Sequence, residues 1–91
     1  MLESVAPQEV KNNIEGYVVY VKDRYHVGYK SKDKIIVVEV EFGGIVAIYA
    51  DSLECNTLDN KKINISEEEK RIFLKRIAEA IQFMGCKADI C

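Results

Sequence analysis

Two adjacent apolar segments separated by a pair of glycines restrict the fold of this chain more than any other feature. Ile35–Phe42 and Ile45–Ala50 are rich in β-branched and aromatic residues, which favour strands. Gly43-Gly44 between them can adopt positive φ angles without steric penalty, as the tight two-residue turn of a hairpin requires. The sequence therefore predicts an antiparallel hairpin in the middle of the chain.

A two-residue turn would also fix the register of this hairpin. The pairs expected on one face of the sheet are Phe42 with Ile45, Val40 with Ala47, and Val38 with Tyr49. The opposite face would then carry Ile35, Val37, Glu39 and Glu41 beside Val46 and Ile48. Since neither face is purely polar, we expect one to cover the core. The other would lie under the N-terminal helix or under a partner.

Weaker signals predict the elements on either side of the hairpin. Pro7 suits the first turn of a helix, so a short N-terminal helix is expected from Pro7 to about Asn13. Asp51–Asn64 is a polar connection in which we expect at most one short strand, around Leu53–Cys55. The other predicted strands are Tyr17–Lys22, Tyr25–Lys30 after a turn at Asp23-Arg24, and Ala88–Ile90.

The clearest helix start in the sequence is Ser66, followed three residues later by Glu69 as in a capping box. Gly85 is a suitable residue to end this helix. Its predicted core stripe consists of Phe73, Leu74, Ile77, Ile81 and Met84, flanked by Ala78 and Ala80. Ile72 and Phe83 fall on the opposite side, either as single exposed residues or as a second packing surface.

Together these elements predict an α+β fold. We expect an antiparallel four- to five-stranded meander sheet, with one long C-terminal amphipathic helix packed on a face and a short N-terminal helix. Ninety-one residues suit one domain, residues 1–91.

Charge is distributed unevenly along the chain. Residues 35–60 contain five acids and no Lys or Arg, a local net charge of −5, whereas the whole chain carries −2. The five acids are Glu39, Glu41, Asp51, Glu54 and Asp59. Such a stretch repels nucleic acid and attracts a basic protein surface. The alternative is an inert, solvated acidic region.

The sequence offers little catalytic chemistry. His26 is the single histidine and lies in a predicted strand, where a structural or solvated role is expected. The cysteines are odd in number and form no Cys-x-x-Cys pair, which favours reduced thiols, with Cys55 and Cys86 as small buried hydrophobic residues. The third cysteine is Cys91. We therefore expect no enzyme activity, no metal site and no cofactor.

Nucleic-acid and membrane binding are not expected either. Five tyrosines on predicted strands resemble a stacking platform, but the basic residues among them cluster at turns and form no continuous groove. No apolar run approaches the ~18 residues that span a bilayer, and the first ten residues are too polar for a signal peptide. These features predict a cytoplasmic protein.

The second half of the chain resembles a known family. A strand ending in Tyr49-Ala50-Asp51-Ser52 leads through a polar loop to Ile65-Ser66-Glu67-Glu68-Glu69, and the helix RIFLKRIAEAIQFMG precedes a last short strand. Over about residues 43–90, this pattern resembles small bacterial immunity proteins of polymorphic-toxin and contact-dependent growth inhibition systems. The resemblance rests on hydrophobic spacing.

The resemblance implies a protein that binds the toxic C-terminal domain of a cognate effector and blocks its active site. Many such toxins are nucleases with basic surfaces. An acidic face on the immunity protein can mimic the phosphate backbone and so bind such a surface. The candidate partner-binding residues are Glu39, Glu41, Tyr49, Asp51, Glu54 and Asp59. The alternative function is a small homodimeric interaction or regulatory domain, which would associate through the half-apolar sheet face or through Ile72 and Phe83.

Overall fold

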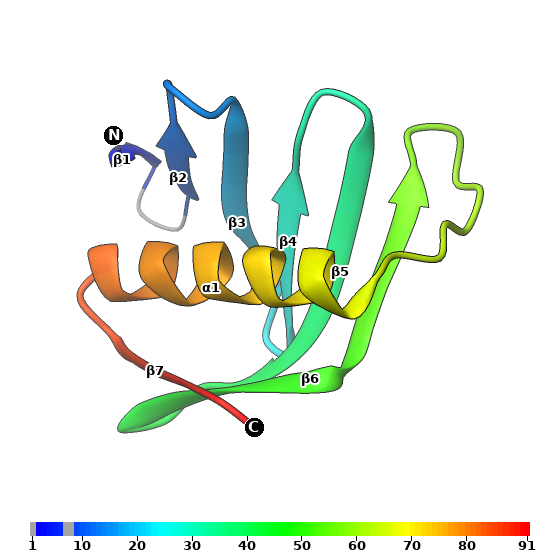
Figure 1. The fold of residues 1–91 in the computed structure, drawn as a ribbon. Coiled ribbons are helices and arrows are strands. Elements are labelled where there is room, and N and C mark those ends of the chain that lie inside the picture. The colour runs from blue at the N-terminus through cyan, green and yellow to red at the C-terminus, as the bar shows by residue number, and fades with distance from the viewer. Residues whose placement is uncertain (1, 7–8) are drawn as a thin grey trace.

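The computed structural model describes residues 2–6 and 9–91, which form one curled sheet and a helix packed against it (Figure 1). The elements in chain order are β1 (Leu2–Ala6), β2 (Glu9–Asn12), β3 (Tyr17–Asp23), β4 (His26–Lys30), β5 (Lys34–Glu41), β6 (Ile45–Thr57), α1 (Glu67–Phe83) and β7 (Lys87–Ile90). Strand order in the sheet follows chain order, and neighbouring strands are antiparallel except for the parallel pair β6–β7. The predicted α+β class is confirmed. The expected purely antiparallel sheet of four to five strands is wrong, because the described sheet is mixed and includes more strands.

The predicted helix from Pro7 to about Asn13 is also wrong. Residues 9–12 form β2, which is paired on both sides by β1 and β3, while Pro7 and Gln8 lie outside the described residues. Val10 and Asn12 are buried and Lys11 between them is exposed. This alternation has the period of a strand. Burial of Val10 against the core therefore outweighs the local signal of a proline at a helix start.

The central hairpin forms, but its register differs by one residue from the prediction. Glu39 pairs with Tyr49, Val40 with Ile48 and Glu41 with Ala47, so the connection is longer than Gly43-Gly44 alone. Neither glycine of that pair has a positive φ, as the predicted two-residue turn would require. The observed register places four aliphatic residues on the same buried face: Val38, Val40, Val46 and Ile48. A register one residue away would turn Val46 and Ile48 toward solvent.

Strand β6 is much longer than predicted, because most of the expected polar connection continues the strand as far as Thr57. The register shifts between Val37 and Glu39, which pair with Glu54 and Tyr49, so extra residues of β6 bulge at this point. Ser52 holds the bulge: its hydroxyl donates to the Tyr49 carbonyl at 2.6 Å and accepts from the Glu39 N–H at 2.8 Å. Figure 1 shows β6 bending sharply between its two halves.

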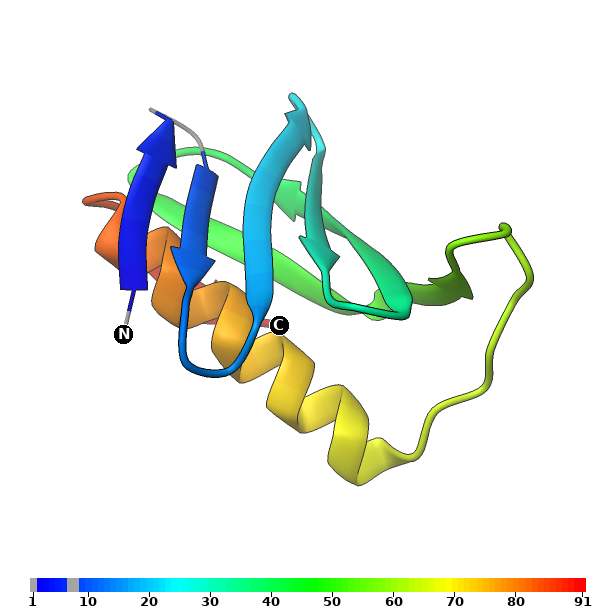
Figure 2. The same cartoon turned by 90° about the horizontal axis from the view of Figure 1, so that it is seen from above.

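Helix α1 covers one face of the sheet, which we call the inner face (Figure 2). The Ser66 hydroxyl accepts the Glu69 N–H at 3.1 Å, as the predicted N-cap requires. At the other end, Gly85 has φ 96° and its N–H donates to the Gln82 carbonyl, while the Cys86 N–H donates to the Ile81 carbonyl. This is a Schellman motif, and it confirms Gly85 as the helix stop.

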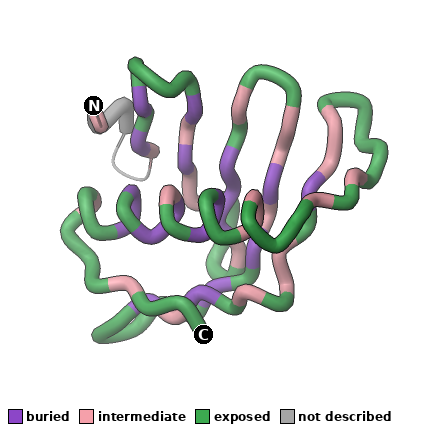
Figure 3. Tube along the Cα trace, in the orientation of Figure 1, coloured by how far each residue is buried: buried purple, intermediate pink, exposed green. Residues whose placement is uncertain are grey.

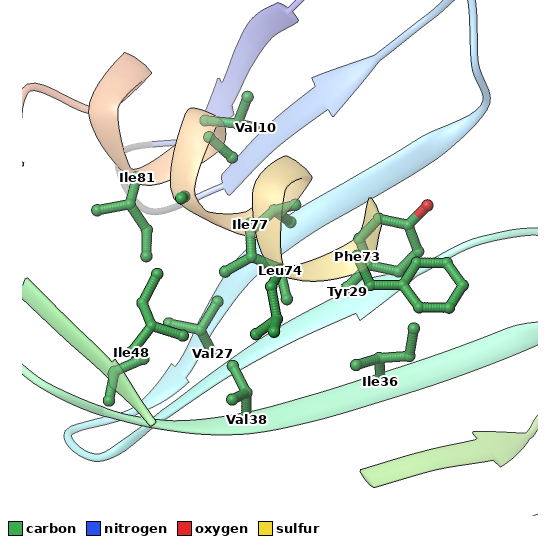
Figure 4. Close-up of a cluster of buried hydrophobic side chains, with 14 of the residues drawn as sticks. Val10, Val27, Tyr29, Ile36, Val38, Ile48, Phe73, Leu74, Ile77 and Ile81 are labelled. Atoms are coloured by element: carbon green, nitrogen blue, oxygen red, sulfur yellow. The ribbon is translucent and has the colours of Figure 1, made fainter. Parts of the chain in front are cut away.

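The core lies between α1 and the inner face. The predicted stripe is confirmed: Phe73, Leu74, Ile77, Ala78, Ala80 and Ile81 are buried, and Met84 is half-buried. Figure 4 shows Ile77, Ile81 and Leu74 directed toward Val27, Val38 and Ile48 of the sheet. Buried residues alternate along the strands and gather where α1 crosses them (Figure 3). In the described residues, no helix is long and apolar enough to cross a membrane.

A cation–aromatic cluster ties the middle of α1 to the sheet. Tyr17 and Tyr29 stack with their ring centroids 4.9 Å apart, and Arg76 lies over the Tyr17 ring at 4.9 Å. The Arg76 guanidinium donates to the Tyr29 hydroxyl at 2.8 Å and pairs with Glu15. Burial raises the pKa of Tyr29, and the hydrogen bond from Arg76 opposes that rise.

Asn12 shapes the turn that presents Glu15 to Arg76. Its side-chain oxygen accepts the N–H groups of Ile14 and Glu15 at 3.0 and 2.9 Å, and its carbonyl accepts the Gly16 N–H at 3.0 Å. An Asn side chain that bonds its own downstream backbone in this way is an Asx turn. The side-chain oxygen of the buried Asn12 is therefore satisfied by the backbone, and its amide nitrogen donates to the Tyr17 hydroxyl at 3.4 Å.

We expect the Arg76–Tyr29 bond to make a measurable contribution to stability. Replacement of Arg76 by Met should lower the free energy of unfolding by about 1.5–3 kcal/mol, because a charged hydrogen bond to a buried hydroxyl is lost. In a double-mutant cycle with Tyr29→Phe, followed by urea denaturation, the coupling energy should be about 1 kcal/mol. Additive effects of the two substitutions would show that the bond contributes nothing.

Candidate protein-binding face

The face of the sheet opposite α1, here called the outer face, carries the acidic residues of the hairpin. Glu39 and Glu41 alternate with the buried Val38 and Val40, so both acids project away from the core. Because Glu39 pairs with Tyr49 across β5 and β6, Tyr49 lies on the same side as the acids. The predicted register placed Tyr49 on the opposite face from Glu39. That prediction is wrong because the pairing that buries Val46 and Ile48 turns Tyr49 outward.

The structure brings four of the six predicted binding residues together. The Tyr49 hydroxyl donates to the Glu41 carboxylate at 2.6 Å. Glu54 pairs with Val37, two residues from Glu39 along β5. Glu39 and Glu54 line one small depression of about 300 Å³, together with Lys22, Asp23, His26, Val37, Ser52 and Asn56.

Asp51 and Asp59 are exposed and do not line this depression. Asp51 is in the bend of β6, and Asp59 is in the turn that follows the strand. In Figure 1 this turn is on the other side of the molecule from the tip of the β5–β6 hairpin. The acidic run of residues 35–60 is therefore not a single surface, because the strand that carries it changes direction.

A larger open depression lies between the β3–β4 turn and the β5–β6 hairpin, and we call it the hairpin depression. Its volume is about 660 Å³, and it is lined by Arg24, Tyr25, His26, Glu39, Val40, Glu41, Phe42 and Tyr49. Three of these are large aromatic residues with much of their surface exposed: Tyr25 at 59%, Phe42 at 42% and Tyr49 at 38%. Aromatic residues gathered at one exposed place are typical of binding surfaces.

The electrostatics of the outer face are acidic with a basic margin. Among the described residues, Glu39, Glu41 and Glu54 form no ion pair with a lysine or arginine. The hydrogen bond to Glu41 raises the pKa of Tyr49, because the carboxylate favours the neutral phenol. Lys22 and Arg24, near the β3–β4 turn, supply positive charge at the edge of the same depressions.

His26 and Asp23 form the one pair on this face that resembles catalytic machinery. His26 Nδ1 and Asp23 Oδ1 lie 2.7 Å apart, and the bond to His26 lowers the pKa of Asp23. Ser52 lines the same small depression, but its hydroxyl proton is donated to the Tyr49 carbonyl. Among the described residues, His26 forms no hydrogen bond with a serine. The same residues also contain no group of three or more His, Cys, Asp or Glu side chains placed to bind a metal ion.

The cysteines correct one further expectation. Cys55 is buried, as predicted, and burial raises the pKa of its thiol. Cys86 is exposed, although it was expected to be buried, because it follows the positive-φ Gly85 just outside the helix. All three cysteines are free thiols.

Sequence reasoning missed the hairpin depression. Tyr25 and Phe42 were placed in strands, whereas both lie just outside the ends of β4 and β5 and belong to turns. The available signal was a large aromatic side chain at each turn, with Tyr25 after Arg24 and Phe42 directly after Glu41. That signal could be interpreted only with the correct register.

No family model, curated protein or solved structure matches this chain. Inference about its function therefore depends on the outer face itself.

The three thiols provide a direct test of the burial described here. With Ellman's reagent at neutral pH, Cys86 and Cys91 should react rapidly and Cys55 only after unfolding, since a buried thiol with a raised pKa is a poor nucleophile. Cys55→Ala should abolish only the slow phase. A rapid reaction of all three thiols in the folded protein would contradict this arrangement.

Proposed function

We propose that this chain is an immunity protein that binds a cognate toxin domain and neutralises it by covering its active site. The observation that carries the proposal is the exposed group Glu39, Glu41 and Tyr49 on the outer face, together with the aromatic hairpin depression beside it. A surface of this kind suits a partner with a basic active-site surface, such as a nuclease domain from a contact-dependent growth inhibition effector.

The geometry of the acids supports this role. Glu39 and Glu41 are two residues apart on one strand, which spaces their backbones by roughly 6.6 Å along the strand. Two carboxylates on the same face of one strand can take the place of neighbouring phosphates on a nuclease surface. Because the described residues give them no ion pair, the main compensation for their desolvation on binding would come from cations of the partner.

The outer face is also held in place before any partner arrives. Ser52 fixes the bulge of β6 by bonding to the backbone of both Glu39 and Tyr49. The Tyr49–Glu41 bond holds the two side chains against each other. A preorganised surface loses less conformational entropy on association. The three free thiols suit the reducing cytoplasm, in which an immunity protein would meet an incoming toxin.

The decisive experiment is protection of living cells. Bacteria that express the toxin domain encoded beside this gene should survive when this chain is co-expressed, and the purified pair should form a complex in which toxin activity is lost. A neighbouring gene without a toxin domain, or a toxin domain that kills despite co-expression, would refute the proposal.

Charge reversal should locate the contact. Glu39→Lys with Glu41→Lys should slow association with the toxin domain by about tenfold or more at low salt and weaken its salt dependence, because steering by complementary charge is lost. The matched control is Asp33→Lys with Glu79→Lys, which changes the net charge equally at exposed positions away from the hairpin. Equal slowing in both variants, measured by stopped flow, would show that only net charge matters.

The rival function, a homodimeric interaction domain, makes a different prediction. Ile72 and Phe83 are exposed on α1, at 46% and 49%, but eleven residues of helix separate them by roughly 16 Å. Two isolated residues make a small contact compared with a stable interface. We therefore expect a monomer of 10.4 kDa in sedimentation equilibrium at micromolar concentration. A tight dimer disrupted by Ile72→Ser with Phe83→Ser would favour the rival.

A further inference from the structure

We propose that the hairpin depression binds an arginine side chain of the protein partner. This inference rests on the proposed function and specifies the chemical group that the outer face recognises. It is drawn from three features of the same place: aromatic walls, carboxylates at hydrogen-bonding positions, and an open volume of about 660 Å³.

The walls of the depression are aromatic. Tyr25 follows the β3 strand in the turn, Phe42 follows β5, and Tyr49 belongs to β6, so three separate segments place rings around one space. Each of these three residues exposes more than a third of its surface. Ring faces attract cations through their quadrupole, and an arginine guanidinium can lie flat on such a ring. In this protein the Arg76 guanidinium already lies over the Tyr17 ring, 4.9 Å from its centroid.

Carboxylates supply the polar half of the site. Glu39 and Glu41 line the depression, and the Tyr49 hydroxyl holds one oxygen of Glu41 at 2.6 Å. That bond fixes the carboxylate while leaving its other oxygen able to accept from a ligand. Acids beside aromatic rings attract a cation and repel an anion, so Glu39 and Glu41 favour a cationic ligand.

Arginine fits better than lysine for a geometrical reason. A guanidinium is planar and donates in a fork that matches carboxylates while its face stacks on a ring, whereas an ammonium is a strongly hydrated point charge. The chain's own Arg24 lines the rim of the depression but forms no ion pair with Glu39 or Glu41 among the described residues. Arg24 therefore leaves these carboxylates open to a cation from outside.

The test is an NMR titration of the intact protein with a defined probe. The probe is acetyl-Gly-Arg-Gly-amide, compared with the same peptide carrying citrulline, a neutral isostere, or lysine. We expect saturable shifts of the Tyr25, Phe42 and Tyr49 rings with the arginine peptide. Binding should be about fivefold or more weaker with citrulline, because the cation contributes both to ring stacking and to the carboxylate contact.

Matched variants keep the test specific. Phe42→Ala and Glu41→Gln should each weaken binding of the arginine peptide by about two- to fivefold. Phe83→Ala and Glu79→Gln, which alter an exposed phenylalanine and an exposed glutamate on α1, should leave it unchanged. Far-UV circular dichroism of each variant establishes that it is folded.

The outcomes separate this inference from the proposed function. Equal binding of the arginine and citrulline peptides, tighter binding of lysine, or shifts located on α1 would overturn the arginine site. If the protein binds the arginine peptide as described but does not protect cells from the neighbouring toxin, the arginine site is supported and the immunity function is refuted. A protein that protects cells but gives no ring shifts up to tens of millimolar peptide loses the site alone.

Discussion

Burial of four aliphatic side chains beneath α1 determines almost everything that the outer face presents. Val38 and Val40 from β5 and Val46 and Ile48 from β6 share the inner face, and this sharing sets the register of the hairpin. Because side chains alternate along a strand, the same register turns Glu39, Glu41 and Tyr49 outward together. The hydrophobic core thus selects the chemistry of the surface behind it, and the hydrogen bond between Tyr49 and Glu41 follows from that selection.

A second constraint links the start of the chain to the helix. Asn12 forms the turn after β2, the turn carries Glu15, and Glu15 pairs with Arg76, which bonds to Tyr29 in the centre of the sheet. Three segments far apart in sequence, the β2–β3 turn, β4 and α1, are joined through one guanidinium. The polar atoms in this region therefore orient elements, whereas Glu39 and Glu41 of the hairpin form no ion pair with a lysine or arginine of the described residues.

Local signals predicted the elements they fully specify. Ser66 and Gly85 mark the helix ends because capping depends only on neighbouring residues, and the stripe from Phe73 to Ile81 follows from helical period. The helix predicted from Pro7 is wrong because residues 9–12 pair with β1 and β3 in the sheet, which local sequence does not reveal. The predicted hairpin register is wrong because Gly43-Gly44 permits a tight turn without enforcing one. Burial of the aliphatic residues in the core determines the register instead. Grouping Asp59 with Glu39 failed because no local signal reveals the bend in β6.

The parallel pairing of β7 with the first half of β6 has a consequence for the order in which the molecule is completed. A parallel neighbour cannot be reached by a tight turn, so the chain must first traverse α1 and the Gly85 turn before β7 can join the sheet. During translation, the hairpin that carries Glu39 and Tyr49 emerges long before the strand that supports its far edge. The edge of β6 at residues 45–48 therefore gains its last neighbour only after residues 87–90 have been synthesised.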